Sequence, residues 1–421
     1  METTESAEST GPTESTGTTE STGTTDSTGT TDSTGTTDST GTTDSTGTTE
    51  STQTARGRRS RRSGPGTGRS PQAFDALVRA EFAPKSTYLN TASNALLPAR
   101  TVAALHEAAV LRAEGRPLTP LYEDVEACRA AYARLAGVPV SRVAVGSSVA
   151  AHTGVIAASL PAGAEVLTAE DDFTSVLNPF HVRGDLKVRT VPLERIAESV
   201  RPGTALVAVS AAQSADGRIA GLSALREAAR AHGARTYVDH SQSAGWLPMD
   251  DAAADDFTAA VSFKWLLGPH GAAFLVVPED LGGLTPLLAG WVAGESPWDS
   301  CYGPVAELAR SARRFDLSHA LFTFAGLRRS LDLVEELGVA AVHDHDVALA
   351  DRFRAGLADL GHEPVPAPGS AIVSVPGLGV RQRELSRAGI EVSDRAGNLR
   401  ASFHLYNTAQ DVDRLLDALS G

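Results

Sequence analysis

The chain has 421 residues, more than one hydrophobic core usually holds, so two domains or a domain and a tail are expected. Its formal net charge of -14 argues against DNA or RNA as the main partner. No apolar run approaches the roughly 18 residues of a membrane span, and Cys128 and Cys301 form neither a disulfide framework nor a metal motif. We expect a cytoplasmic protein with no metal site and no membrane partner.

The beginning of the chain is a polar repeat. Residues 1–54 repeat Ser-Thr-Gly-Thr-Thr-Asp/Glu every six positions and have almost no apolar side chain to bury. This composition predicts a disordered, low-complexity tail, which we place at residues 1–71. Within it, the arginine-rich stretch 56–62 can either contact an anionic surface or serve as a solvated linker.

The rest of the chain alternates between helical and strand patterns. Apolar periodicity predicts helices over 101–113, 123–136 and 223–232, and short buried strands at 143–145, 165–167, 188–191, 205–209 and 236–238. This alternation predicts a mostly parallel α/β sheet that is covered on both faces and binds ligands beyond the carboxyl ends of its strands. We divide this part into an N-terminal arm (72–98), a large domain (99–330) and a smaller α+β domain (331–421) with a short strand near 372–374.

Lys264 is the most informative residue of the large domain. It is one of only three lysines and follows an apolar run, whereas Lys85 and Lys187 lie in polar stretches. A desolvated lysine can lose its charge and attack a carbonyl group. Upstream, a predicted strand ends in Asp239, and Gln242 follows three positions later. An acid, an amide and a buried lysine in this order indicate a site for pyridoxal 5'-phosphate (PLP).

The strings VDHSQSAGWLPMD and AAVSFKWLLGPHGAAFLVV around these residues resemble the cofactor signature of the class V aminotransferase superfamily, PLP enzymes of fold type I. The resemblance implies a large domain with a mostly parallel seven-stranded sheet. It also implies that Lys264 carries the cofactor and that Asp239 keeps the ring nitrogen protonated, so that the ring can accept electrons from the substrate α-carbon. Gln242 would bond the phenolic oxygen.

The resemblance also assigns the remaining cofactor contacts. Gly-Ser-Ser-Val after the strand at 143–145 opens a helix, whose free N-H groups favour a phosphate dianion. Further candidates are Phe173, which would stack on the ring, and either Gln213 or Ser214, which would bond the ring or its oxygen. The residues predicted to contact the phosphate are Ser147, Ser148, Val149 and Ser262.

The C-terminal string LRASFHLYNT is similar to the ending of group II cysteine desulfurases and their relatives. By this similarity Arg400 would hold the substrate carboxylate through two parallel hydrogen bonds, and Asn94 would line the same pocket. The stretches 290–291 and 314–318 resemble more loosely the segments through which one subunit reaches the other's phosphate. We therefore expect a homodimer with the site at the subunit interface, acting on a small amino-acid substrate.

The reaction type is left open by the residues. A cysteine desulfurase needs a thiol shortly before the carboxylate-binding arginine, and residues 390–398 contain no cysteine. The family's common first step is that the substrate amine replaces Lys264 on the cofactor, after which the lysine acts as general acid and base. We take transaminase as the nominal activity. The alternatives are a β-eliminating carbon-sulfur lyase, a kynureninase-like hydrolase, an epimerase, and a non-catalytic PLP-fold binding protein.

Overall fold

The computed structural model describes residues 70–249 and 251–421. Residues 1–69 of the predicted tail, including the arginine-rich stretch 56–62, lie outside the described residues. In the part of the chain that is described, no helix is both long and apolar enough to cross a membrane.

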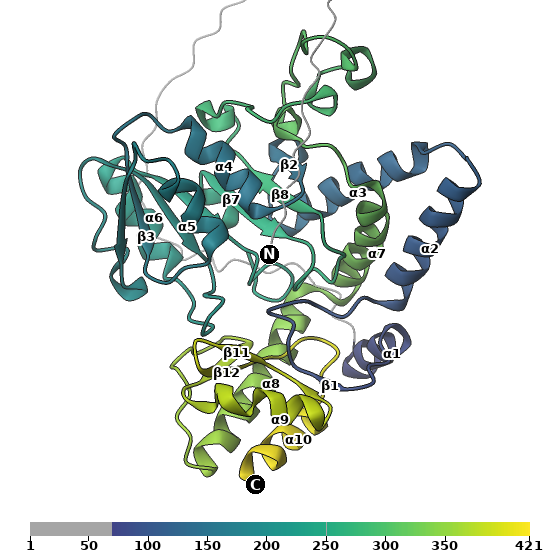
Figure 1. The fold of residues 1–421 in the computed structure, drawn as a ribbon, viewed down its shortest axis with the longest axis vertical. Coiled ribbons are helices and arrows are strands. Elements are labelled where there is room, and N and C mark those ends of the chain that lie inside the picture. Colours follow the sequence, from purple (N-terminus) through teal and green to yellow (C-terminus); the bar gives the residue numbers. More distant parts are fainter. Residues whose placement is uncertain (1–69, 250) are drawn as a thin grey trace, which may run out of the picture. The chain divides into compact units, whose positions relative to one another are not determined.

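A seven-stranded sheet forms the centre of the fold (Figure 1). Its strand order is β2-β8-β7-β6-β5-β3-β4, and all neighbours are parallel except β8, which runs antiparallel to β2 and β7. The strands are β2 (Val143–Gly146), β3 (Glu165–Ala169), β4 (Lys187–Val191), β5 (Thr204–Ser210), β6 (Arg235–Asp239), β7 (Phe257–Val261) and β8 (Ala273–Val276). The predicted fold class, with a mostly parallel seven-stranded sheet, is confirmed.

Helices cover both faces of this sheet, because successive strand residues point to opposite sides. In β2, for example, Ala144 packs in the cluster that contains Ile156 of α4, whereas Val145 packs in the cluster that contains Tyr132 of α3. The helices that surround the sheet are α2 (Ala99–Ala113), α3 (Thr119–Leu135), α4 (Val149–Ser159), α5 (Thr174–His181), α6 (Leu222–His232) and α7 (Leu321–Leu337). With apolar layers on both sides, strands β5, β7 and β8 are nearly continuous hydrophobic runs, whereas the edge strand β4 is partly exposed.

The N-terminal arm joins the C-terminal part of the chain. Helix α1 (Pro71–Glu81) begins at Ser70, whose side chain accepts a hydrogen bond from the Ala73 amide, and it has a proline in its first turn. Strand β1 (Thr87–Tyr88) then pairs in parallel with β10 (Ile390–Glu391). This pairing packs the arm against the C-terminal part of the chain.

The C-terminal part contains a second, three-stranded antiparallel sheet in the order β11-β12-β9. Its strands are β9 (Ile372–Val375), β11 (Ser393–Arg395) and β12 (Asn398–Ser402), and its helices are α8 (Val339–Asp359), α9 (Gln382–Arg387) and α10 (Ala409–Ser420). The sequence pattern predicted only β9. Hairpin β11-β12 was missed because it is polar, although Ala396 and Gly397 at its turn both have positive φ, as a tight hairpin requires.

Short 3-10 helices connect these elements. They are η1 (Val140–Arg142), η2 (Leu193–Arg195), η3 (Ala252–Ala254), η4 (Leu281–Gly283), η5 (Trp291–Ala293), η6 (Pro297–Ser300), η7 (Ala312–Phe315) and η8 (Leu378–Arg381).

Candidate active site

The predicted cofactor residues lie at one edge of the large sheet. Asp239 is the last residue of β6, and Gly146 is the last residue of β2. Lys264 follows the end of β7 by three residues. Because β2, β6 and β7 run in the same direction, their carboxyl ends meet at the same edge. The fold therefore brings together groups that lie more than a hundred residues apart in the sequence.

Lys264 is almost completely buried, with 6% of its surface exposed. Its Nζ lies 5.0 Å from the centre of the Phe173 ring and 5.8 Å from that of Phe263. Burial lowers the pKa of Lys264 to about 8; the charge of Asp239 opposes this shift, and the charge of Arg400 adds to it. A large fraction of this amine is consequently neutral just above neutral pH, as a nucleophile or a general base requires.

Asp239 is buried and has its backbone fixed by strand β6. Burial raises the pKa of its carboxyl group to about 6, and hydrogen bonds from Ser241 work against this rise. The Ser241 amide donates to Oδ1 over 2.8 Å. Because the pKa stays below 7, the carboxylate is mostly ionised at neutral pH and can partner a protonated ring nitrogen.

Gln242 is held by three groups of the protein. Its Nε2 donates to the Ala92 carbonyl and to the Ser214 hydroxyl, both over 2.9 Å, and its Oε1 accepts from the Trp265 indole over 2.8 Å. Both amide hydrogens are therefore used in this structure. A bond from Gln242 to a cofactor oxygen requires one of them to change partner.

Ser214 and its neighbour Gln213 face different groups. The Ser214 hydroxyl and carbonyl both accept from Arg400, over 3.2 and 2.5 Å. Gln213 instead turns to Asp172, with 3.2 Å between Nε2 and Oδ2. The structure thus places Ser214, rather than Gln213, between Gln242 and Arg400.

The predicted phosphate residues surround the beginning of α4. Ser147 is exposed, the Ser148 hydroxyl caps the helix by accepting from the Ala151 amide over 3.2 Å, and Val149 is the first helical residue. The first amides of a helix have no intrahelical acceptor and are available to an anion. Ser262 differs from these residues because it is fully buried and its hydroxyl donates to the Pro269 carbonyl over 2.5 Å.

Phe173 lies directly before α5 and keeps 44% of its surface exposed, with its ring centre 5.0 Å from Nζ of Lys264. Its backbone amide donates to Asp172 Oδ1 over 2.7 Å. Asp172 in turn accepts from the Ser210 amide at the end of β5, over 2.8 Å. Phe173 is thereby fixed close to Lys264 while its ring stays open to a ligand.

Arg400 is a buried cation without an acidic partner among the described residues. Only 1% of its surface is exposed, and its Nη2 donates to the Ser93 hydroxyl over 2.7 Å. Its Nε has no hydrogen-bond partner in the part of the chain that the structure describes. Burial lowers the pKa of Arg400 to about 9, with a further contribution from the charge of Arg395. A buried charge that lacks an ion pair is costly, so this side chain favours binding of an anion.

Asn94, the second predicted substrate residue, contacts the segment that follows Lys264. Its Oδ1 is 2.6 Å from Nε2 of His270, and its carbonyl accepts from the Tyr88 hydroxyl over 2.8 Å. The His270 ring stacks on Phe263, which directly precedes Lys264, with 3.7 Å between ring centres. Asn94 is thus linked to the lysine loop, and no hydrogen bond between described residues joins it to Arg400.

Comparison with known proteins identifies the family. The model of the family "Aminotransferase class-V" matches residues 87–415. The chain belongs to this family. Isopenicillin N epimerase of Streptomyces clavuligerus is 30% identical to this class V chain over 391 residues, which cover 82% of the chain and 97% of that protein. An uncharacterized aminotransferase of Bacillus subtilis, YcbU, is 27% identical and covers 71% of the chain and 84% of its own length.

Solved structures share the fold of this class V chain. The complex of a cystine C-S lyase with cysteine persulfide matches it with a TM-score of 0.73 at 22% identity, covering 82% of the chain and 99% of the lyase. A cysteine desulfurase from Thermococcus onnurineus NA1 matches with a TM-score of 0.72 at 20% identity, covering 82% of the chain and 97% of that protein. At this identity the similarity establishes the fold and no more.

The cofactor of this class V chain is PLP. The described residues fit it: Lys264 is a buried amine with a lowered pKa, Asp239 is a buried carboxylate that is ionised at neutral pH, and the amides at the beginning of α4 are available to a phosphate. That these residues, with Ser147, Ser148 and Phe173, make the contacts remains a prediction.

Sequence reasoning missed several groups that support the class V site. His404, within the C-terminal string, places its Nδ1 2.9 Å from Asp346 and its Nε2 3.2 Å from the Trp265 carbonyl. Burial lowers the pKa of His404 to about 3 and raises that of Asp346 well above its usual value. This buried pair connects α8 to the residue that follows Lys264. No local pattern shows it, because its members lie far apart in the sequence.

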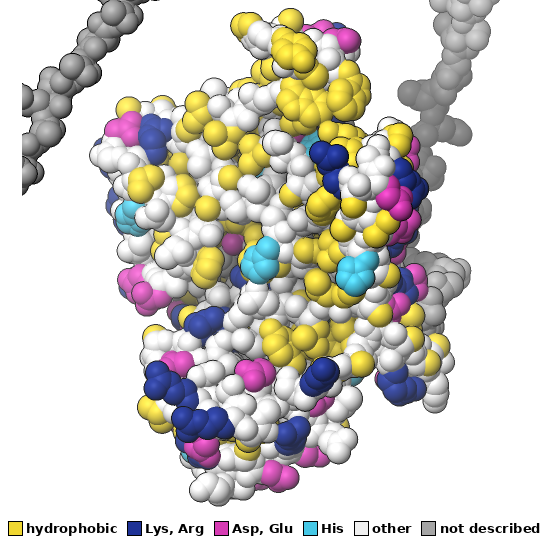
Figure 2. Space-filling model, turned by 45° about the vertical axis from the view of Figure 1, so that its right-hand side comes forward, with side chains coloured by type: hydrophobic (Ala, Val, Ile, Leu, Met, Phe, Trp, Pro, Cys, Tyr) yellow, Lys and Arg dark blue, Asp and Glu magenta, His cyan; other side chains and the backbone are white. Residues whose placement is uncertain are grey.

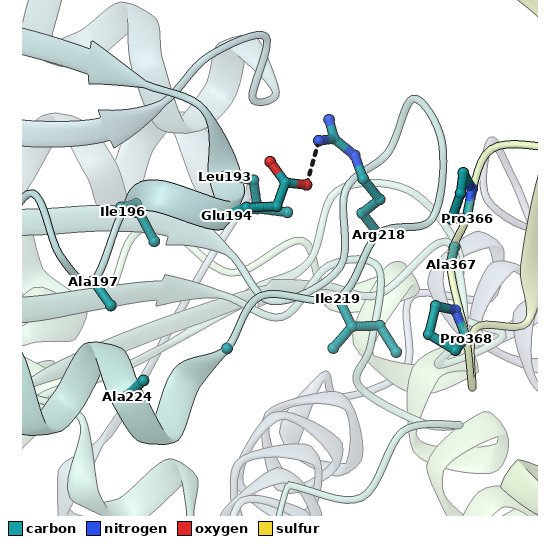
Figure 3. Close-up of a pocket in the computed structure, with 11 residues that line it drawn as sticks. Leu193, Glu194, Ile196, Ala197, Arg218, Ile219, Ala224, Pro366, Ala367 and Pro368 are labelled. Atoms are coloured by element: carbon teal, nitrogen blue, oxygen red, sulfur yellow. Dashed lines mark hydrogen bonds and ion pairs between the residues drawn. The ribbon is translucent and has the colours of Figure 1, made fainter.

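A separate pocket of the class V fold contains none of the predicted site residues (Figure 3). Residues from η2, from the loop before α6 and from 366–368 line it. Arg218 on its wall is already neutralised, since its guanidinium lies 2.7 Å from Glu194 and 2.9 Å from Asp216. This pocket therefore carries no unpaired charge with which to bind an ion.

Proposed function

We propose that this class V PLP enzyme acts on an amino-acid substrate and is, in its nominal activity, a transaminase. The observation that carries the proposal is that the candidate site contains two buried basic side chains that differ in their tendency to lose a proton. The pKa of Lys264 is lowered to about 8, whereas Arg400 stays charged and has no acidic partner among the described residues. An amino acid needs one group to move a proton at its α-carbon and another to hold its carboxylate.

In this proposal Arg400 binds the substrate carboxylate with the planar fork of its guanidinium, and its unused Nε supports that role. Lys264 removes the proton from the substrate α-carbon and later returns it to a different atom. Asp239 holds the protonated ring nitrogen, and Phe173 covers the ring without being able to transfer a proton. When bound, PLP supplies an electron sink for the bond that is broken at the α-carbon.

Persulfide chemistry is not proposed. Cys128 lies in α3, fully buried, with its thiol donating to the Phe324 carbonyl over 3.4 Å. Burial raises its pKa well above the usual value, which keeps it a thiol. Cys301 is exposed in the segment after η6. Neither cysteine belongs to hairpin β11-β12, which carries Arg400.

A β-eliminating lyase is the alternative. The same residues serve it, because elimination also begins with removal of the α-proton by Lys264. The two reactions differ in the next step, in which elimination expels a group from the β-carbon of the substrate. The relatives named epimerase and kynureninase keep two further outcomes open within the family, return of the proton to the other face and hydrolytic cleavage.

The test is an incubation of the PLP-loaded protein with a panel of amino acids and a keto acid other than pyruvate that accepts the amino group, followed by product analysis. We expect each reactive amino acid to be converted to its keto acid, with the amino group transferred to the acceptor and not released as ammonia. Pyruvate together with an equal amount of ammonia would instead indicate elimination. Appearance of the opposite stereoisomer would indicate epimerisation. A protein that binds PLP and changes none of the amino acids would support the non-catalytic reading.

We also propose a homodimer. Between β8 and α7 the chain exposes several large apolar side chains, and Figure 2 shows hydrophobic side chains gathered over this part at the top of the view. Trp298 is 68% exposed and Tyr302 94% exposed, which is expensive in water. Light scattering should give twice the monomer mass, and replacing both residues with serine should shift the protein towards the monomer. A monomeric wild-type protein would contradict the proposal.

Part of the stretch predicted to reach the partner subunit has an internal role. Asp316 is fully buried, 2.7 Å from Arg129, and it accepts from the Val145 amide over 2.9 Å. It therefore fixes the end of β2 from within its own chain. In the dimer proposal the contact is expected from the exposed residues around Trp298.

A further inference from the structure

Hairpin β11-β12 presents two arginines on one face. Arg395 pairs with Asn398, and Ser393 pairs with Arg400. Residues directly opposite each other in an antiparallel pair lie on the same face, as do residues two apart along a strand. Arg395 and Arg400 therefore point to the same side of the hairpin. This side is the one on which Arg400 meets Ser214 of the large domain.

The two guanidinium groups meet at a single oxygen atom. Arg395 Nη2 donates to the Ser93 hydroxyl oxygen over 2.9 Å, and Arg400 Nη2 donates to the same oxygen over 2.7 Å. The charge of Arg395 also contributes to lowering the pKa of both Arg400 and Lys264. Three cations thus lie near one another beside the proposed substrate site.

No carboxylate of the described residues forms an ion pair with either arginine. The nearest acid in the sequence, Asp394, points elsewhere: its Oδ1 accepts from the Gly397 amide over 2.9 Å and stabilises the hairpin turn. Arg352 on α8, by comparison, lies 2.7 Å from Asp413. Close cations without a counter-charge repel each other, and bound anions relieve that repulsion.

We propose that Arg395 binds a second acidic group of the substrate, so that the enzyme selects amino acids with a carboxylate on the side chain. The inference rests on the proposed function, in which Arg400 holds the α-carboxylate. The burial of the two residues supports this division. Arg400 is buried and affects Lys264 more strongly than Arg395 does, whereas Arg395 is exposed on the hairpin and suits the distal end of a longer ligand.

The test uses ligands without an amino group, which cannot react with the cofactor. Binding of glutarate and of butyrate to the full-length, PLP-loaded protein is measured by calorimetry. The wild type should bind glutarate about tenfold more tightly, as expected for one added charge-assisted hydrogen bond at an exposed site. Arg395→Gln should weaken glutarate by about tenfold and leave butyrate within about twofold, whereas Arg400→Lys should weaken both ligands.

The matched control is Arg352→Gln, which removes an exposed arginine on α8 and should change neither affinity. Equal weakening of both ligands by Arg395→Gln would overturn the inference, because both arginines would then hold the same carboxylate. No weakening of either ligand would overturn it too.

Turnover separates this inference from the proposed function. Glutamate and aspartate should be turned over faster than glutamine and asparagine, and Arg395→Gln should remove that preference. If no amino acid reacts but Arg395→Gln still abolishes the glutarate preference, the proposed activity fails and the second anion site stands. If amino acids react without any preference for the acidic ones, and glutarate binds no better than butyrate, the activity stands and the second anion site is refuted.

Discussion

The two halves of the candidate site are built in different ways. The strand-end cluster, Asp239 and Lys264, depends on the backbone of two adjacent parallel strands of the large sheet. The hairpin-arm cluster, Ser93 and Arg400, joins two segments that lie about 300 residues apart, and a hydrogen bond between the side chains links them. The first cluster is fixed by the sheet itself, whereas the second depends on how the arm and the C-terminal sheet pack together.

This difference predicts that one cluster binds the cofactor and the other binds the substrate. The strand-end cluster lies on a rigid scaffold with both faces buried, which suits a cofactor that stays bound through every turnover. The hairpin-arm cluster lies between separate segments and can form a further hydrogen bond, since Nε of Arg400 has no partner among the described residues. It therefore suits a substrate that must enter and leave. Changes in the hairpin-arm cluster should leave PLP bound, and changes in the strand-end cluster should leave carboxylate binding largely intact.

The largest effect is expected from Lys264→Ala. Loss of the amine should prevent covalent fixation of PLP by borohydride and lower turnover by at least about a thousandfold, because both the attachment point and the general base are removed. Peptide mapping after reduction checks the first result, and Lys187→Ala, an exposed lysine at the beginning of β4, is the control. Binding of butyrate, which depends on Arg400, should survive. A variant that still takes up PLP covalently would show that another lysine carries it.

A substitution in the hairpin-arm cluster should have the next largest effect. Arg400→Lys keeps the charge but loses the fork, so amino-acid affinity should fall by about 1.5–3 kcal/mol while PLP stays bound. Titration with an amino acid and with the corresponding amine lacking the carboxylate measures this, and the amine should be unaffected. Arg226→Lys is a matched control, because Arg226 is also buried but is neutralised by Asp255 at 2.6 Å. Equal weakening of both ligands would remove Arg400 from the substrate site.

A pH series tests the coupling between the clusters. The pKa of Lys264 is lowered to about 8, so the neutral amine increases as the pH rises through 8. After PLP is removed, its rate of re-uptake should rise by about tenfold from pH 7 to 9 and then level off. Because the charge of Arg400 lowers this pKa, Arg400→Gln should move the plateau to higher pH. Asp239→Asn should move it to lower pH, since the Asp239 charge raises the pKa. A rate that keeps rising towards pH 10.5 would show that Lys264 has the pKa of an ordinary, solvent-exposed lysine.

The two clusters also differ in how far the sequence alone revealed them. Asp239 and Lys264 follow short apolar runs. Such a run predicts both a buried strand and the position at which the strand ends. The arginine partners could not be predicted in the same way. Ser393 and Arg395 lie in a polar hairpin without a strand-like pattern, and their meeting with Ser93 is a contact between distant segments.

Family resemblance supplied part of what pattern could not. It pointed to Arg400 and Asn94 as residues of the substrate site. It assigned no role to Arg395, and it did not predict the buried contact between His404 and Asp346. Such contacts are set by side-chain packing between segments, which neither periodicity nor a short motif encodes.

The smallest effect is expected where neither cluster is touched. Changing Cys128 and Cys301 together to serine should leave turnover within about twofold, because the proposed chemistry uses no protein thiol. Serine can donate to the Phe324 carbonyl as the Cys128 thiol does, so the cost at this buried position should be a modest drop in melting temperature. The Cys301→Ser single variant, at an exposed position, serves as the control for stability. A folded, PLP-loaded double variant without activity would bring back persulfide chemistry, and one of the two thiols would then have to reach the substrate between the clusters.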